Sequence, residues 1–192
     1  MSICSGPDYP DDLKRASDDR SGTEVVDDCG VTDTSSDFVA HEDHVRLLAG
    51  ANSSGAPVYE LIPAAMVEPE VYDVIGIPGL VCGCAAGDRI RIAQDGRFEV
   101  LRRGGNLCLV LVPRTPRRDG AIAALRSAFG RLGGVVEMPT NGRFIVVTVP
   151  ATAGFAAVED AMETWASDND SDWYFGNVYD EDDRPLNWWI TS

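Results

Sequence analysis

The stretch "GDRIRIAQDGRFEVLRRGGNLCLVLVP" (residues 87–113) contains two strand signals in succession. In its first part, apolar residues alternate with charged ones on both sides of Asp95-Gly96. The alternating apolar positions are Ile90, Ile92, Phe98 and Val100. This pattern predicts an antiparallel hairpin with one apolar face, since Asp-Gly is a strong turn signal. The second part, residues 106–113, is continuously apolar and indicates a central strand.

Upstream of this stretch, short strands are again favoured. "HVRLLAG" and "VYELIP" flank "ANSSGAP" (residues 51–57), whose composition is typical of a turn. "VYDVIGIPGLV" (residues 71–81) contains Gly76, Pro78 and Gly79, so we expect an extended, bent segment there. Several strands without an intervening helix predict a small, strongly bent antiparallel sheet or partial barrel.

Downstream, the apolar spacing becomes helical. "RRDGAIAALRSAFGRLGG" (residues 117–134) predicts a helix that ends at Gly133. "VVEMPTNGRFIVVTVP" (residues 135–150) predicts two strands joined by a tight turn at Asn141-Gly142. A second helix follows, with Thr152 as its N-cap, and "DWYFGNVYD" (residues 172–180) is expected to form a final strand.

The order strand, helix, strand, strand, helix, strand is that of ferredoxin-like, split β-α-β domains. We therefore expect an α+β protein with a small all-β subdomain over residues 44–105 and a ferredoxin-like subdomain with an acidic, aromatic tail over residues 106–192. Residues 1–43 are rich in Asp, Ser, Thr and Gly, without periodicity, and are expected to be a disordered acidic arm.

The charge of the chain is strongly negative and unevenly placed. The net charge is -15 over 192 residues. Residues 1–45 carry a net -9, residues 46–150 a net +3, and residues 151–192 a net -9. This balance argues against binding to nucleic acid, which requires cationic groups, and against docking on anionic lipid. It indicates an acidic surface for a basic partner or, more simply, solubility and attraction between the ends and the core.

Cysteine and histidine usage excludes several site types. The five cysteines are Cys4, Cys29, Cys82, Cys84 and Cys108, and no apolar signal segment precedes them. We expect a cytoplasmic protein with free thiols and no cofactor. Cys82-Gly-Cys84 has the wrong spacing for a zinc ribbon, so a redox or metal role for this pair is a minor alternative. Both histidines lie near the edge of the acidic arm, too far upstream to pair predictably with a thiol nucleophile.

Scattered motifs of the middle region resemble the family known as domain of unknown function 4265, over residues 44–180. The matching positions are Glu60, Tyr72, Ile77-Pro78, Gly87-Asp88 and Gly104-Gly105-Asn106. Members usually have an aromatic residue after Ile-Pro, where this chain has Gly79. The resemblance supports the fold and implies no activity.

Carboxylates are the remaining candidates for chemistry. Glu60, Asp88, Glu99 and Glu137 could pair as acid and base, although a turn role suits Asp88 and a solvent-facing position suits Glu99. The run "DNDSDWYFGNVYD" begins like a calcium loop at Asp168, but Trp173 and Tyr179 occupy the positions that need Gly and Glu. We expect neither calcium binding nor a catalytic site.

Acidic and aromatic residues are dense near the C-terminus, and we expect them to bind a basic protein. The candidate residues are Asp168, Asp170, Asp172, Trp173, Tyr174, Asp180, Glu181, Asp182, Asp183, Trp188 and Trp189. Rings supply affinity and carboxylates supply rate and orientation at such surfaces. The favoured function is a non-catalytic binding domain, for instance an immunity protein that neutralises a basic toxin. The simpler alternative for these residues is a core edge followed by a solvated tail.

Two other functions remain open from the sequence. One is a small-molecule-binding or enzymatic domain with its site between the two halves, lined by Tyr59, Tyr72, Asp88, Arg102 and Arg103. The other is a regulatory module that self-associates through the ferredoxin-like sheet.

Overall fold

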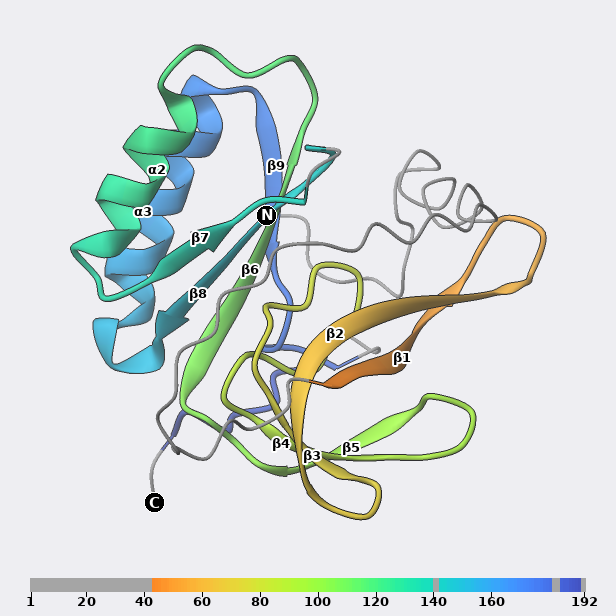
Figure 1. Ribbon diagram of the computed structural model, residues 1–192. Coiled ribbons are helices and arrows are strands. Elements are labelled where there is room, and N and C mark those ends of the chain that lie inside the picture. The colour runs from red at the N-terminus through yellow and green to blue at the C-terminus, as the bar shows by residue number, and fades with distance from the viewer. Residues whose placement is uncertain (1–42, 140–141, 181–183, 191–192) are drawn as a thin grey trace, which may run out of the picture.

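The computed structural model describes residues 43–139, 142–180 and 184–190, and shows a mixed α+β protein with two antiparallel sheets and two α-helices (Figure 1). The five-stranded sheet has the order β1 (Asp43–Ala51), β2 (Pro57–Glu68), β3 (Val71–Val74), β4 (Arg89–Ile92), β5 (Phe98–Arg102). The four-stranded sheet has the order β7 (Val135–Glu137), β8 (Ile145–Pro150), β6 (Asn106–Pro113), β9 (Ser171–Phe175). The helices are α2 (Ala121–Gly130) and α3 (Phe155–Asp168), with a 3₁₀ turn, η2 (Ala151–Ala153), before α3. The proposed arm of residues 1–43 lies outside the described residues, apart from the backbone of Asp43.

The predicted hairpin is confirmed as β4 and β5. Ile90 lies opposite Val100 and Ile92 lies opposite Phe98, so the apolar residues share one face. Gly96 has a φ of 84° in the connecting turn, a conformation that glycine adopts at little cost. The alternation in the sequence is therefore the alternation of the two faces of the sheet.

The five-stranded sheet is curved. Its strands follow one another as a meander, and the N–H of Leu48 in β1 donates to the carbonyl of Gly96 in the β4–β5 turn, with an N···O distance of 2.8 Å. The first strand and the last hairpin thus meet, and the inner face closes around its own core. That core contains Val45, Leu47, Ile62, Ala64, Val74, Val81, Cys84 and Ile90.

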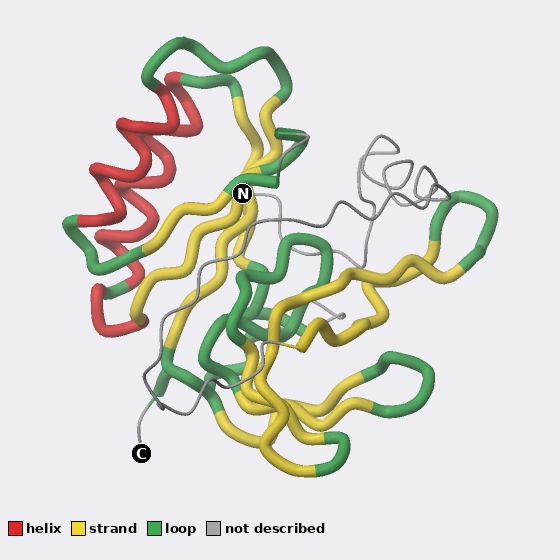
Figure 2. The backbone as a smooth tube through the Cα atoms, in the orientation of Figure 1, coloured by secondary structure: helices red, strands yellow, loops and turns green. Residues whose placement is uncertain are grey.

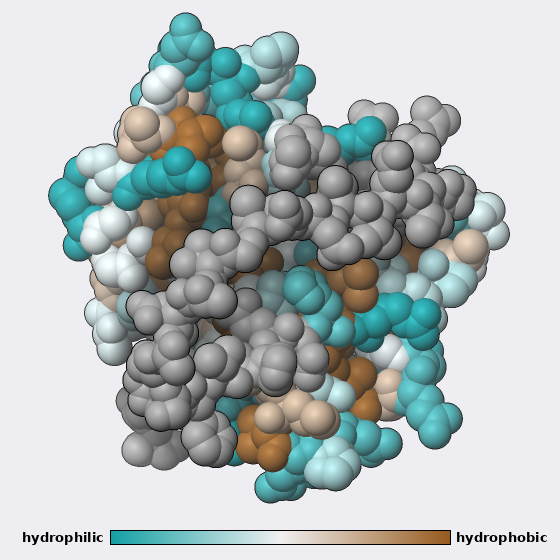
Figure 3. Space-filling model, viewed as in Figure 1, coloured by the Kyte–Doolittle hydropathy of each residue, from teal (hydrophilic) through white to brown (hydrophobic). Residues whose placement is uncertain are grey.

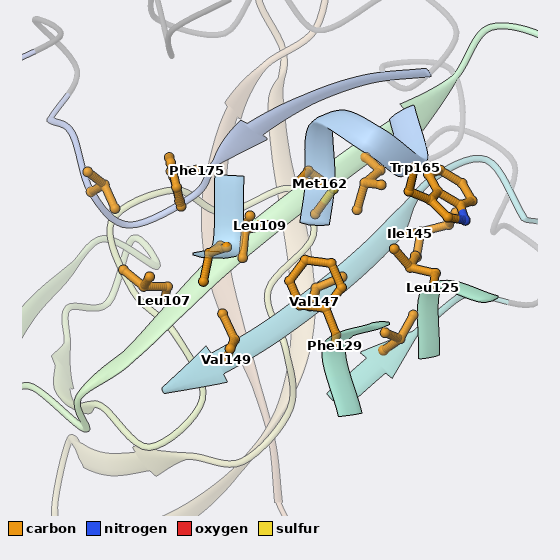
Figure 4. Close-up of a cluster of buried hydrophobic side chains, with 14 of the residues drawn as sticks. Leu107, Leu109, Leu125, Phe129, Ile145, Val147, Val149, Met162, Trp165 and Phe175 are labelled. Carbon is orange, nitrogen blue, oxygen red and sulfur yellow. The ribbon is translucent and has the colours of Figure 1, made fainter. Parts of the chain in front are cut away.

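β6 is the central strand that the apolar run predicts. It pairs with β8 on one side and β9 on the other, and both helices cover one face of this sheet (Figure 1). Alternate residues of β6 and β8 point into the layer between the sheet and the helices, where they meet Leu125 and Phe129 of α2 and Met162 of α3 (Figure 4). Burial of about 1.5–3 kcal/mol per large side chain makes this layer a main source of stability.

The C-terminal end of α2 agrees with the prediction from the sequence, and the N-terminal end of α3 differs from it. The N–H of Gly134 donates to Phe129 and that of Gly133 to Gly130, with Gly133 at a φ of 77°, so Gly133 does terminate the α2 segment. The prediction of Thr152 as the N-cap of α3 is wrong. Gly154 takes the N-cap position without a side-chain bond, because Thr152 lies within η2.

The connection between β7 and β8 is longer than predicted. Glu137 pairs with Val146, so residues 138–145 separate the last paired positions where a two-residue turn at Asn141-Gly142 was expected. Gly142 has a φ of 63°, and Arg117 donates to its carbonyl at 2.7 Å. Asn141 lies outside the described residues. A local turn signal contains no information on the contact with Arg117, which lies 25 residues earlier in the chain.

The loop of residues 75–88 joins the two sheets. It lies between them (Figure 2), and Ile77 and Leu80 pack against Val110, Phe144 and Val146 on the face of the four-stranded sheet opposite the helices. On the face seen in Figure 3, polar residues cover much of the described surface and apolar ones gather in patches. Exposed apolar side chains include Leu61 at 60% and Val135 at 57%.

Substitution of Gly104 by alanine tests how closely the sheets approach at the end of this loop. A Cβ at this position would meet the backbone of Gly87, which cannot rotate away, so we expect Gly104→Ala to lower the free energy of unfolding by about 1–3 kcal/mol. Gly130→Ala is the matched control, because that helical position faces open space and should gain about 0.5–1 kcal/mol. Urea unfolding measures both variants. Equal free energies of unfolding for the two variants would contradict the close approach of Gly104 to the backbone of Gly87.

Candidate functional site

The best-organised polar group of the described residues lies at the junction of the two sheets, around Asp88. This side chain is 1% exposed. Its Oδ1 accepts the N–H of Gly104 at 2.7 Å, and its Oδ2 accepts the N–H of Ala85 at 3.1 Å and Nη1 of Arg103 at 3.1 Å. Arg103 also donates to the carbonyl of Gly83 at 2.8 Å. We call Asp88, Arg103 and these backbone partners the Asp88 clasp.

Burial raises the pKa of the Asp88 carboxyl, while the bonds from Gly104, Arg103 and Ala85 oppose that rise. A carboxyl with a raised pKa is a general-acid candidate in principle. Here both oxygens are held by donors of the protein itself. The geometry therefore supports a structural role, in which the carboxylate ties the β5–β6 connection to the loop between the sheets.

Glu60 performs a similar task at the other end of that loop. Its carboxylate accepts three successive backbone N–H groups, from Gly79, Leu80 and Val81, each at 2.9 Å. Burial raises the pKa of Glu60, and the three bonds lower it. Three donors to one carboxylate hold the loop against β2, which positions a turn that has no regular secondary structure.

The four candidate carboxylates do not form an acid–base pair. Glu60 faces the loop and Asp88 the clasp, whereas Glu99 lies opposite Arg91 on the charged face of the hairpin. Glu137 is exposed on β7, in the other sheet. No two of them share a described hydrogen-bond partner, so the geometry gives no support to acid–base catalysis by this set.

Asn177 is a structural residue that the sequence did not indicate. It is 0% exposed, its Oδ1 accepts the N–H of Cys108 at 2.9 Å, and its Nδ2 donates to the carbonyl of Asn106 at 2.8 Å. The side chain of Asn106 donates in turn to the carbonyl of Ala86 at 2.8 Å. The end of β9, the start of β6 and the loop are thus joined. A lone Asn after a predicted strand carries no signal for this, because its partners are up to 71 residues away.

Three thiols lie near the junction, with different accessibility. Cys82 is exposed, whereas Cys84 and Cys108 are buried. Burial raises the pKa of both buried thiols well above the usual range, so neither is a ready nucleophile. Cys108 Sγ donates to the carbonyl of Pro78 at 3.3 Å. Within the described residues, no group of three or more His, Cys, Asp or Glu side chains is arranged to hold a metal ion.

The proposed lining of a ligand site is dispersed. Tyr59 lies under Arg46, 4.3 Å from its guanidinium carbon to the ring centroid. Tyr72 packs in the core of the five-stranded sheet, and Arg102 lies 3.9 Å from Asp73 across β4. Of the five residues, only Asp88 and Arg103 meet, and they bind each other.

The predicted partner-binding residues separate into two groups at opposite ends of α3. Asp168 is the last residue of α3, and Asp170, at a φ of 45°, follows it in the turn to β9. Asp172 forms a bidentate ion pair with Arg114, with N···O distances of 2.6 and 2.7 Å. These three aspartates lie at the C-terminal end of the helix.

The second group lies near the N-terminal end of α3. Trp189 packs on Phe155, the first residue of the helix, with ring centroids 5.1 Å apart. Trp188 donates to the carbonyl of Asn177 at 2.7 Å, and its ring lies 5.5 Å from the guanidinium carbon of Arg103. Asp180 accepts the N–H of Arg184 at 2.8 Å in the same tail. A helix of 14 residues separates the groups by about 20 Å.

The remaining predicted residues have mixed positions. Trp173 and Tyr174 are half-buried on β9, with Trp173 packed against Phe175 at a centroid distance of 5.3 Å. Glu181, Asp182 and Asp183 lie outside the described residues. Much of the ring surface in this region is therefore used for packing within the protein.

α3 itself connects the two groups, and three of its acids, Glu159, Asp160 and Glu163, are not among the predicted partner-binding residues. The helix carries Glu159, Asp160, Glu163 and Asp168, and no basic residue. Asp160, Glu163 and Asp168 are exposed, and Glu159 is half-buried. These acids lie within "VEDAMETWASD" (residues 158–168), whose apolar spacing is the pattern that predicts the helix. We call these four residues the α3 acidic face.

Comparisons with known proteins agree with the fold and give no activity. A family model described as "Domain of unknown function (DUF4265)" matches residues 60–173. No curated protein matches the chain. Among solved structures, a hypothetical protein from Neisseria gonorrhoeae is similar with a TM-score of 0.56 and 12% identity, over 70% of this chain and 94% of that chain. At this identity the likeness concerns the fold alone. No helix of the described residues is both long and apolar enough to span a membrane.

Removal of Arg103 tests the Asp88 clasp. Arg103→Ala leaves a buried carboxylate without its counter-charge, and we expect a loss of about 3–5 kcal/mol in the free energy of unfolding. Arg114→Ala breaks an ion pair that is 63% and 49% exposed, and should cost about 1 kcal/mol or less. Because Arg103→Ala alone could prevent folding, the double variant with Asp88→Asn is measured as well. A double variant no more stable than Arg103→Ala would contradict the coupling.

Alkylation kinetics test the accessibility of the thiols. With iodoacetamide at neutral to mildly basic pH, we expect Cys82 to react first among the three described cysteines, and Cys84 and Cys108 to react only upon opening of the junction. Peptide mass spectrometry measures each rate. Cys82→Ser is the control, and fast labelling of Cys108 in the native protein would show that the loop does not cover it.

Proposed function

Because the chain belongs to the DUF4265 family, whose description assigns no activity, its function has to be inferred from its own surface, and we propose that it is a non-catalytic protein-binding domain. The α3 acidic face binds a basic partner protein. The observation that carries the proposal is a helix with four acids and no base, in a protein whose junction carboxylates Asp88 and Glu60 are bound by its own donors.

The acids of α3 destabilise the helix that bears them. Glu159 and Glu163 are four residues apart and Asp160 and Glu163 three apart, so each pair repels across one turn. Asp168 lies in the last turn, at the negative end of the helix dipole, where an acid is unfavourable by about 0.3–1 kcal/mol. Such local conflicts are expected where a surface serves binding.

The finer architecture belongs to the same proposal. We treat residues 44–105 as a partial-barrel subdomain and residues 106–192 as a ferredoxin-like subdomain. In this arrangement the second sheet presents α3 on its outer layer, and the Asp88 clasp holds the two subdomains together.

One concrete form of the function is an immunity protein that covers the cleft of a cationic toxin such as a nuclease. An acidic helix on a rigid sheet suits this task, because charge complementarity speeds association and orients the partner. The test measures the activity of a toxin encoded beside this chain, with and without a molar excess of the chain. Toxin activity that persists at a molar excess of the chain would exclude this form and leave other basic partners open.

A ligand-binding or enzymatic site at the junction is less well supported. Asp88 is 1% exposed, and its ion pair with Arg103 occupies the place where such a ligand would need converging polar groups. The described geometry thus favours a surface function over a cavity function.

Charge reversal on α3 tests the proposal. The probe is a fluorescent deca-arginine peptide, and its affinity for the full chain is measured by anisotropy at about 50 mM salt, where screening is weak. We expect the double variant Asp160→Arg, Glu163→Arg to weaken binding by about thirtyfold, since the two lost attractions are worth about 1 kcal/mol each at contact in water.

The matched control carries the same change in net charge elsewhere. Glu68→Arg with Glu99→Arg reverses two exposed acids of the five-stranded sheet. We expect a smaller loss of affinity for this control. Equal losses would show that only net charge matters, and no binding by the native chain would overturn the proposal.

A further inference from the structure

We propose that the side of α3 facing β9 is an arginine-binding surface, formed by Trp173, Phe155 and Trp189 together with Glu159 and Glu163. This inference rests on the proposed function and names the chemistry of its partner, an arginine-rich segment of a basic protein. We call these five residues the aromatic-acidic strip.

The rings of this region form a connected series. Trp173 contacts Phe175 at a centroid distance of 5.3 Å, Phe175 contacts Phe155 at 5.5 Å, and Phe155 contacts Trp189 at 5.1 Å. Phe175 is buried, whereas Trp173, Phe155 and Trp189 are each half-buried. Three partly open rings therefore follow the line along which α3 meets β9.

The two carboxylates lie along the same side of the helix. Phe155, Glu159 and Glu163 succeed one another at intervals of four residues, so each lies about one turn above the last. The ring of Phe155 marks this side as the one that faces β9, because it contacts Phe175. Trp165, by contrast, lies on the α2 side, where its Nε1 donates to the carbonyl of Ala121 at 2.8 Å.

β9 and α3 run in opposite directions, and two residues of the strand rise by about as much as four residues of the helix. Trp173 precedes Phe175 by two residues, about 6.6 Å along β9, and Glu159 follows Phe155 by four residues, about 6 Å along α3. From these ideal rises, and from the contact of Phe155 with Phe175, we infer that Trp173 and Glu159 lie at a similar height. A cation over the open part of the Trp173 ring would have a carboxylate of α3 at the same height.

The protein already contains arginine–aromatic contacts of this kind within its own chain. The guanidinium carbon of Arg103 lies 5.5 Å from the ring centroid of Trp188, which itself packs on Trp189 at a centroid distance of 5.7 Å. Arg46 lies 4.3 Å from the centroid of Tyr59. An arginine of the chain therefore already lies on a ring at one end of the series. The half-buried rings of Trp189, Phe155 and Trp173 could be contacted by an arginine in the same way.

The surface selects arginine over lysine. A guanidinium is planar and weakly hydrated, so it stacks on an indole while its N–H groups reach a neighbouring carboxylate. An ammonium is compact and strongly hydrated, and gains less from a ring that is half open to water. The carboxylates attract both cations, whereas the rings discriminate between them.

The experiment compares deca-arginine with deca-lysine on the full chain, by anisotropy at low salt. We expect tighter binding of deca-arginine, by about two- to fivefold for each ring engaged. Trp173→Leu and Trp189→Leu keep an apolar side chain, and each should reduce the arginine-to-lysine ratio without a comparable loss of lysine affinity. Leu61→Ala, an exposed apolar position at 60% exposure, is the control and should leave the ratio unchanged.

The outcomes separate this inference from the proposed function. Binding of neither peptide overturns the proposed function and the inference together. Equal binding of both peptides, with a ratio that Trp173→Leu does not alter, overturns the inference alone. If either tryptophan variant fails to fold, two other measurements replace it. One is the affinity of the Glu159→Gln, Glu163→Gln variant for both peptides, and the other is the intrinsic tryptophan fluorescence of the native chain with each peptide. A fluorescence change with deca-arginine that exceeds the change with deca-lysine supports the strip, and equal changes contradict it.

Discussion

The buried carboxylate of Asp88 is the constraint on which the rest of this structure depends. A charge that is 1% exposed is tolerated only if donors surround it, and here they come from the loop between the sheets and from the β5–β6 connection. Meeting that requirement brings Arg103 under Trp188 and Gly104 against Gly87. One donor to this buried carboxylate, Arg103, thus also contacts the C-terminal tail through the ring of Trp188.

The need to hold the two sheets together also explains which positions carry the resemblance to the family. Most of its positions lie at the junction between the sheets. Glu60 binds the loop, Asp88 and Gly104 belong to the clasp, Gly87 lies against Gly104, and Asn106 ties the loop to β6. Where an aromatic residue is expected after Ile-Pro, Gly79 instead leaves room for the ring of Phe144, which a Cβ at that position would meet. These positions report how the halves are joined, so the resemblance carries a fold and no chemistry.

The sequence predicted what depends on neighbours along the chain. The β4–β5 hairpin, the central β6 and the two helices follow from periodicity and local turn signals, which need no tertiary information. The N-cap of α3 and the length of the β7–β8 connection were wrong, because η2 displaced Thr152 and distant contacts shape the loop around Gly142. Asn177 and the clasp could not be predicted, since their partners meet only after the sheets do. The candidate partner residues were found as a composition, but those that the structure describes lie at the two ends of α3 and on β9.

The separation of those residues changes what the acidic charge can mean. A contiguous acidic tail needs no explanation beyond solubility, because solvated carboxylates repel little in water. Acids fixed on one helix are different, since Glu159 and Glu163 stand one turn apart and Asp168 opposes the dipole at the C-terminal end. The fold does not require them there, because α3 is held by Val158, Met162 and Trp165 on its buried side. Neutral residues on the exposed side would stabilise the helix equally well or better. The acids persist at a cost to stability, which a basic partner on that face would offset.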